Sequence, residues 1–166
     1  VGSDILHGHV VLVGYGEKGK IILDELLQRH LSVVVVDDHH AVVEELREKK
    51  VNSIYGDATD PAILIQAHIH EAAILVLAID NEILCRKIVE TAKILRPTIE
   101  TVMPAENEED AKALKADGVA QAFVPDELLA QAIVQFTMSR FGKESEDQKI
   151  REEEAEEQKA IERGAL

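Results

Sequence analysis

The chain has 166 residues, of which 46% are apolar and 30% are charged, proportions typical of one globular domain that buries a core of its own. Only 3% of the residues are aromatic and there is no tryptophan, so we expect an aliphatic core. A formal net charge of −14 gives the chain no general attraction for DNA, RNA or anionic lipid, which argues against nucleic-acid binding.

Strand-like and helix-like segments alternate along the whole chain. Short apolar runs predict strands over residues 9–13, 32–36, 53–55, 72–78, 98–103 and 120–124. A segment with helical spacing follows each run, over about 17–29, 41–49, 61–67, 82–95, 107–116 and 125–142. Six such units with short connections predict an α/β fold, a Rossmann-like, doubly wound parallel sheet of six strands with a C-terminal helical extension.

The first strand leads into a glycine-rich turn, which is followed by the first helix. Gly14, Gly16 and Gly19 have the GxGxxG spacing. In such a turn the first glycine permits the tight bend, the second lets a phosphate approach the backbone, and the third lets helix and strand pack closely. Free N–H groups and the positive end of the helix dipole then attract an anion, so we expect a nucleotide phosphate here.

The second strand ends in two acidic residues, Asp37 and Asp38. Asp37 lies 18 residues after Gly19, close to the spacing at which a carboxylate meets a ribose hydroxyl in this kind of fold. The pair therefore favours a nucleotide site over a purely structural turn. In the next unit, Asp60 is placed to cap a helix that has Pro61 at its first position.

Cys85 is the only cysteine, so no internal disulfide can form, and this suits a reducing compartment. It falls in a predicted helix, where a small core residue is expected. No apolar stretch approaches the roughly 20 residues that cross a bilayer, and no signal peptide is apparent. We therefore expect a cytoplasmic location without direct membrane insertion.

The last predicted helix ends near Gly142 and is apolar on two faces, formed by Leu129, Ile133 and Phe136 and by Ala130, Val134, Met138 and Phe141. Either the helix is wedged deeply into its own domain, or the second face packs against another chain or domain. Residues 143–166 are rich in charge, with like charges four residues apart, and predict a solvated or frayed helix or a segment leading to a further partner.

One alternative function is that of a small NAD-dependent oxidoreductase. It would need a general acid or base beside the nicotinamide, and the best candidates at predicted strand ends are Asp80, Asn81 and Glu106. None forms a recognisable pair with a base, and the nucleotide fold uses nearly all of the ordered length. We therefore expect that the protein is not an enzyme.

A second alternative is a metal-sensing module that uses the histidines at positions 7 and 9, 39 and 40, and 68 and 70. Surface or helix-end roles are expected for each pair, and we predict no metal ligand. His39 and His40 begin a predicted helix beside the presumed ribose carboxylates, where an imidazole could stack on adenine or face water.

Over residues 9–141 the chain resembles the nucleotide-binding RCK (TrkA-N) domains that regulate potassium channels and transporters. The resemblance rests on four motifs in this order, VVLVGYGEKGK, VVVVDD, YGDATDP and AIDNE. The first motif and GDAT look closest to the cytosolic domains of Kef-type cation/proton antiporters. The resemblance implies a nucleotide-binding domain over residues 1–142 and a charged tail, helical or disordered, over residues 143–166.

The family resemblance implies regulation without turnover. It implies that an adenine nucleotide binds (AMP or NAD(H), with ATP as a further option), rearranges paired domains and so gates ion flux. For this chain it implies a homodimer through the last predicted helix. It also implies a membrane cation transporter, in the same or a separate chain, and a place at the inner face of the membrane.

Carried over by motif, the resemblance also implies which residues bind the nucleotide. These are Gly14, Tyr15, Gly16, Lys18 and Gly19 around the phosphate, Asp37 with Asp38 at the ribose, Asp57 and Ala58 at the adenine, and Ile79 and Asp80 along the rest of the cleft.

Two positions depart from the family pattern. Many relatives have arginine directly after the second glycine, whereas this chain has Glu17, a carboxylate that repels phosphate. This departure favours AMP over a dinucleotide or ATP, although Lys18 or Lys20 could partly compensate. Calcium-gated relatives have Glu-x-Glu after the fifth strand, whereas this chain reads Pro104-Ala105-Glu106, which argues against calcium at that place.

Overall fold

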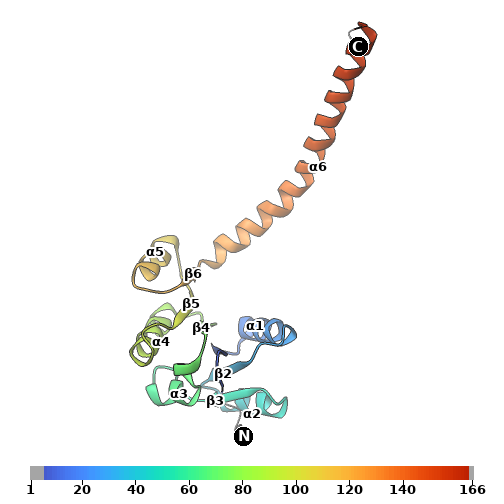
Figure 1. The fold of residues 1–166 in the computed structure, drawn as a ribbon. Coiled ribbons are helices and arrows are strands. Elements are labelled where there is room, and N and C mark those ends of the chain that lie inside the picture. The colour runs from blue at the N-terminus through green and yellow to red at the C-terminus, as the bar shows by residue number, and fades with distance from the viewer. Residues whose placement is uncertain (1–5, 165–166) are drawn as a thin grey trace. The chain divides into compact units, whose positions relative to one another are not determined.

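The computed structural model describes residues 6–164, and within residues 143–145 it describes the backbone alone. Strands and helices alternate in it as predicted (Figure 1). The strands are β1 (Val10–Val13), β2 (Val33–Asp37), β3 (Asn52–Tyr55), β4 (Ile74–Leu77), β5 (Glu100–Pro104) and β6 (Gln121–Phe123). The helices are α1 (Glu17–Gln28), α2 (His40–Glu48), α3 (Pro61–Gln66), the 3-10 turn η1 (Ile69–Glu71), α4 (Glu82–Leu95), α5 (Glu108–Ala116) and α6 (Pro125–Glu162).

The six strands form one parallel sheet in the order β3-β2-β1-β4-β5-β6. β1 is paired on both sides, with Val10 opposite Val33 of β2 and opposite Ile74 of β4. Strands β2 and β3 therefore follow one another on one side of β1, and β4, β5 and β6 follow one another on its other side. This order confirms the predicted Rossmann-like, doubly wound parallel sheet.

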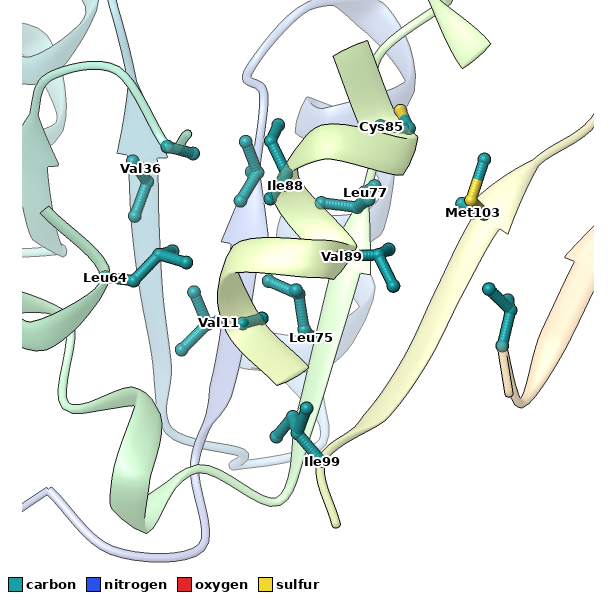
Figure 2. Close-up of a cluster of buried hydrophobic side chains, with 14 of the residues drawn as sticks. Val11, Val36, Leu64, Leu75, Leu77, Cys85, Ile88, Val89, Ile99 and Met103 are labelled. Carbon is teal, nitrogen blue, oxygen red and sulfur yellow. The ribbon is translucent and has the colours of Figure 1, made fainter. Parts of the chain in front are cut away.

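Each face of the sheet has its own apolar layer, because alternate side chains of a strand point to opposite faces. On one face, Val10 and Leu12 of β1 pack with Leu23 of α1 and Leu46 of α2. The layer on the opposite face contains Val11 and Val13 of β1 together with side chains of α3, α4 and α5. Figure 2 shows part of this layer, with Leu64, Leu75 and Ile88 packed around Val11. Both layers are almost wholly aliphatic, as the composition predicts.

Local signals at the helix starts place the helices with respect to the sheet. Asp60 accepts a hydrogen bond from the Ala62 N–H group at 2.9 Å, with Pro61 at the first helical position, as predicted for α3. Asn81 caps α4 in the same manner, its side-chain oxygen accepting from the Leu84 N–H group at 3.0 Å. Both caps fix the point at which the chain leaves a strand end and turns back along the sheet.

Cys85 of α4 is fully buried in the layer of Figure 2, which is the core role predicted for it. Its thiol donates a weak hydrogen bond to the Ile79 carbonyl oxygen at 3.5 Å. Burial raises the pKa of the Cys85 thiol to about 11, so the thiol is protonated at neutral pH.

The last helix is longer than predicted. α6 continues through Gly142 to Glu162, so the predicted end near Gly142 is wrong. A glycine inside a helix costs only about 1 kcal/mol relative to alanine and does not by itself end the helix. The glycine that follows the actual end is Gly164, with a positive φ of 68°.

The chain divides into two units, one up to Pro125 and one from Asp126 onward, and each is described by itself. The first holds the sheet and the helices that cover it. The second is α6, in which Ile133, Val134 and Phe136 are each more than half exposed. A domain boundary at residue 142 stays a prediction.

Candidate nucleotide-binding site

A cleft of about 530 Å³ lies at the carboxyl ends of the central strands. Its walls come from the segments that follow β1, β2, β3 and β4, together with apolar side chains of α2 and α4. β1 and β4 are the neighbouring strands at the topological switch point, where the order of the strands in the sheet reverses. In open parallel sheets a ligand binds at such a position, beyond the carboxyl ends of the strands.

Nine of the eleven predicted site residues line this cleft, namely Gly14, Tyr15, Gly16, Asp37, Asp38, Asp57, Ala58, Ile79 and Asp80. The other two, Lys18 and Gly19, belong to α1, and each contacts a lining residue: Lys18 pairs with Asp80, and Gly19 lies against the Gly14 carbonyl group. Lining residues that sequence reasoning missed include Val42 of α2 and Leu84 and Ile88 of α4. These are ordinary apolar helix positions, and no motif marks them as part of a cleft.

At two of the glycines in the turn there is no room for a side chain. Gly14 has φ +99°, and a Cβ on it would lie 2.9 Å from the Ala78 carbonyl oxygen. A Cβ on Gly19 would lie only 2.1 Å from the Gly14 carbonyl oxygen, a backbone atom that cannot move away freely. These contacts match the roles expected of the first and third glycines, the tight bend and the close packing of helix on strand.

Gly16 is different, because a Cβ on it would meet nothing within 4 Å. It stands at the N-cap of α1, with ordinary extended dihedral angles and no side-chain cap on the first N–H groups of the helix. Space above a glycine next to uncapped N–H groups is what an approaching phosphate requires.

Asp37 connects the end of β2 to the glycine turn. Its side chain is 7% exposed, and its Oδ2 accepts a hydrogen bond from the Tyr15 N–H group at 2.9 Å. Its Oδ1 accepts one from the His39 N–H group at 2.8 Å. Two backbone donors therefore fix the carboxylate beside the turn, where the sequence predicts a ribose contact.

The His39 ring also reaches the Asp37 carboxylate. His39 Nδ1 lies 2.8 Å from Asp37 Oδ1 and 2.9 Å from Asp38 Oδ1. The hydrogen bond to Asp37, then the charges of Asp37 and Asp38, raise the pKa of His39 above its usual 6.5. Sequence reasoning noted that His39 stands near the carboxylates but did not predict this contact.

The charges near the glycine turn are mostly acidic. Lys18 forms an ion pair with Asp80, a residue of the cleft wall that follows β4. Glu17 is the first residue of α1, and the Lys20 Nζ atom lies over the Tyr15 ring, 5.6 Å from its centroid. The lysine nearest in sequence to the presumed phosphate therefore already has a carboxylate partner.

Asp57 is committed to a local turn after β3. Its Oδ1 accepts hydrogen bonds from the Thr59 N–H group at 2.9 Å and from the Thr59 hydroxyl at 2.7 Å. These two bonds lower the pKa of Asp57. The turn brings Ala58, which is buried, to the cleft wall.

The candidates for acid–base chemistry are not brought together. Asp80 lines the cleft, whereas the Asn81 side chain caps α4 and Glu106 is not among the lining residues. The Glu106 N–H group donates to Glu82 Oε1 at 3.2 Å, outside the cleft.

The histidine pairs are dispersed as well. His7 pairs with Glu71, His9 is buried with its Nε2 against the Ala67 carbonyl oxygen, and the His40 ring packs edge-on against Tyr55. His68 has a left-handed backbone at the start of η1. Among the side chains that the structure describes, Asp37, Asp38 and His39 form the one close group of three metal-ligating types. We interpret this group as an ion-pair cluster, because His39 Nδ1 lies 2.8 and 2.9 Å from the two carboxylates.

The fold and the cleft define a Rossmann-like domain of the nucleotide-binding type. The chain belongs to the TrkA-N domain family, whose model matches residues 10–125. This confirms the RCK (TrkA-N) resemblance. No helix within residues 6–164 is both long and apolar enough to span a membrane.

Two curated relatives are membrane transport proteins by name. The chain is 29% identical over 127 residues to the putative cation/proton antiporter YbaL of Escherichia coli, covering 76% of this chain and 23% of YbaL. It is 33% identical over 122 residues to potassium channel protein 1 of Methanocaldococcus jannaschii, covering 72% of this chain and 37% of the channel. The chain thus spans about a quarter to two fifths of these relatives.

Solved structures show the same fold. The TrkA-N domain of the inner membrane protein YbaL of Escherichia coli is 28% identical, with a TM-score of 0.75 over 80% of this chain and 98% of that domain. An AMP-bound Kef CTD of Shewanella denitrificans (24% identity, TM-score 0.64) covers 78% of this chain and 80% of its own. The GsuK channel bound to NAD is 20% identical, with a TM-score of 0.64, and the match covers 72% of this chain and 22% of the channel chain. The last two show likeness of fold alone.

Proposed function

We propose that this chain is the regulatory nucleotide-binding part of a potassium or other cation transport system. In this proposal it binds an adenine nucleotide in the cleft without turning it over. The observation that carries the proposal is the buried Asp37 carboxylate, which two backbone N–H groups hold beside an uncapped glycine turn. The names of the antiporter and channel relatives, and of neighbours bound to AMP or NAD, support the transport role and the class of ligand.

Each part of an adenine nucleotide has a matching part of the cleft. The phosphate meets the N–H groups at the start of α1 and the open space above Gly16. The ribose hydroxyls donate to Asp37, with Asp38 beside it. The adenine lies against Ala58, and the rest of the cleft is closed by Ile79 and Asp80.

The acidic surroundings favour a nucleotide with a single phosphate. Glu17 stands at the start of α1, and Lys18 is already paired with Asp80. A second or third phosphate adds negative charge at a place where carboxylates already repel it. AMP is therefore the preferred ligand in this proposal, with NAD(H) next and ATP last.

We further propose that two copies pair through α6 and that the nucleotide acts by changing their arrangement. α6 has a broad apolar face that is largely exposed in a single copy, and such a face marks an interface. A nucleotide shifts an arrangement only if it binds two arrangements with different affinity. In the cell this unit acts on a membrane cation transporter in the same or a separate chain, on the cytoplasmic side.

The sharpest test of the site is Asp37→Ala. Loss of the ribose acceptor should weaken AMP binding by about 10- to 100-fold, because a hydrogen bond to a charged group contributes about 1.5–3 kcal/mol. Isothermal titration calorimetry with AMP, NAD and ATP measures this, and circular dichroism checks that the variant is folded. Asp24→Ala, which removes an exposed carboxylate on α1 away from the cleft, is the matched control. Equal affinities for the Asp37 variant and the parent would contradict the ribose role.

Absence of turnover is tested separately. At stoichiometric protein, NADH or NADPH with added carbonyl compounds should show no protein-dependent hydride transfer by absorbance. A measurable transfer would favour the oxidoreductase alternative instead.

A further inference from the structure

The contact between His39 and Asp37 bears on the same carboxylate that the nucleotide needs. We propose that a proton on His39 competes with the ribose of the nucleotide for Asp37, so that the cleft releases its nucleotide as the pH falls. The inference rests on the proposed function and adds a second ligand, the proton, to that site.

The competition follows from counting acceptor positions on Asp37. A carboxylate offers about four lone-pair positions, two on each oxygen. The Tyr15 N–H group takes one on Oδ2 and the His39 N–H group takes one on Oδ1. His39 Nδ1, 2.8 Å away, takes the second position on Oδ1. One position then remains, whereas the two hydroxyls of a ribose require two.

Burial prevents Asp37 from avoiding this competition. Its side chain is 7% exposed and two backbone donors hold it, so it cannot rotate to present other positions. The His39 side chain, in contrast, is 74% exposed and can swing into solvent when the ribose arrives. The imidazole is therefore the partner that leaves.

Protonation decides whether the imidazole stays. Nδ1 binds carboxylates only when it carries a hydrogen, and in the other neutral tautomer it is an acceptor that both carboxylates repel. A charged ring is held by Asp37 and by Asp38, at 2.8 and 2.9 Å. When a nucleotide displaces the charged ring, the ring loses its carboxylate partners and its pKa falls back toward the usual 6.5, so that above this pH the ring releases its extra proton to the solvent.

The groups around His39 set the sign of the effect. On β2 and just beyond it, the ring faces Asp37 and Asp38. On α2 its neighbour is His40, which pairs with Glu44. Asp57 after β3 and Asp80 after β4 line the same cleft, and Asp80 is paired with Lys18. All the carboxylates favour the charged ring, and the one cation among them is already paired.

The pKa of His39 is raised above 6.5, through its hydrogen bond to Asp37 and then the charges of Asp37 and Asp38. The His39–Asp37 pair is thus fully formed below pH 6.5 and is lost as the pH rises through the raised pKa. Nucleotide binding prefers the state without the pair. Affinity for nucleotide should therefore increase with pH between 6.5, the usual pKa of a histidine ring, and the raised pKa, by up to about tenfold per pH unit, and level off on either side of this interval.

The test is calorimetric titration of AMP into the parent protein and into His39→Asn, from about pH 5.5 to about pH 8.5, with EDTA present. Asparagine is a good N-cap and does not titrate, so α2 keeps its start. The AMP phosphate itself titrates near pH 6, and both proteins meet the same phosphate, so the difference between their pH profiles isolates the imidazole.

We expect the parent to lose affinity more steeply than His39→Asn as the pH falls. Repeating the titration in buffers of different ionisation enthalpy should show that binding to the parent releases up to about one more proton than binding to the variant. His40→Asn is the matched control, because this histidine packs on Tyr55 outside the cleft, and it should keep the parental profile.

Identical pH profiles and proton release for the parent and His39→Asn would overturn the inference while leaving AMP binding intact. Absence of AMP binding at every pH would overturn the proposed function and the inference with it. An NMR titration of the His39 ring with and without AMP requires no substitution. The His39 pKa should fall when AMP is bound, and an unchanged pKa would also count against the competition.

Discussion

Within the glycine turn, two glycines differ in what an added methyl group would meet. A Cβ on Gly19 would come within 2.1 Å of the Gly14 carbonyl oxygen, whereas a Cβ on Gly16 would meet no atom within 4 Å. We therefore expect that Gly19 is required for the fold and that Gly16 is required for binding of the ligand.

Gly19→Ala should destabilise the protein by about 1–3 kcal/mol, because the backbone of the turn must shift. Gly16→Ala should change the free energy of unfolding by less than about 1 kcal/mol, yet weaken AMP binding, because its methyl group occupies the space of the phosphate. Urea denaturation and calorimetry of both variants measure these effects. A stable Gly19→Ala protein, or unchanged AMP affinity of Gly16→Ala, would contradict this assignment.

Glu17 is the residue expected to limit the number of phosphates. Glu17→Arg replaces a repelling carboxylate with a guanidinium that can hold a phosphate. It should raise the affinity for ATP and NAD by about tenfold or more, roughly 1.4 kcal/mol, and the affinity for AMP by less. Glu25→Arg makes the same change of charge on an exposed position of α1 away from the cleft and serves as the control. Equal gains for the three nucleotides would show that Glu17 does not select among them.

Individual site residues could be predicted where one strand ends and a polar or glycine residue follows. Asp37 and Gly14 are such residues, because parallel strands bring their carboxyl ends to one edge of the sheet. Side-chain pairs could not be predicted in this way. Lys18 and Asp80 are 62 residues apart, and their contact depends on how the start of α1 meets the segment that follows β4.

The apolar face of α6 predicts that two copies of the chain pair through this helix. Val134→Glu places a charge in the middle of this face and should convert a dimer into a monomer in sedimentation velocity experiments. Gln135→Glu introduces the same side chain on the polar side of the helix, together with Gln131 and Ser139, and should leave the dimer intact. If both variants sediment like the parent, α6 does not form the interface.

Element types followed from the sequence more reliably than element ends. Strands covered on both faces are continuous apolar runs, and capping residues such as Asp60 mark helix starts directly. The end of α6 could not be predicted, because a glycine such as Gly142 often follows the end of a helix but can also lie within one. No proline follows it, and the charged residues after it are good helix formers.

For the molecule as a whole, regulation requires that nucleotide binding and pairing influence one another. Such coupling is reciprocal, so a nucleotide that favours one arrangement of the pair must bind that arrangement more tightly. If the parent forms the proposed dimer, the nucleotide affinity should therefore differ between the parent and a monomer made by Val134→Glu, by about 5- to 150-fold for coupling of ordinary size. Calorimetry at a protein concentration where the parent is dimeric measures this. Equal affinities would mean that pairing and binding are independent.

The buried thiol of Cys85 has a practical consequence for such experiments. Because thiol reagents attack the thiolate, raising the pKa from 9.0 to about 11 lowers the reactive fraction roughly hundredfold, and the surrounding core blocks access as well. A cysteine introduced at Gln131 would then be the site that takes a spin label or fluorophore, with the native cysteine left in place. Distances between labels on two copies, with and without AMP, would report directly on movement within the pair.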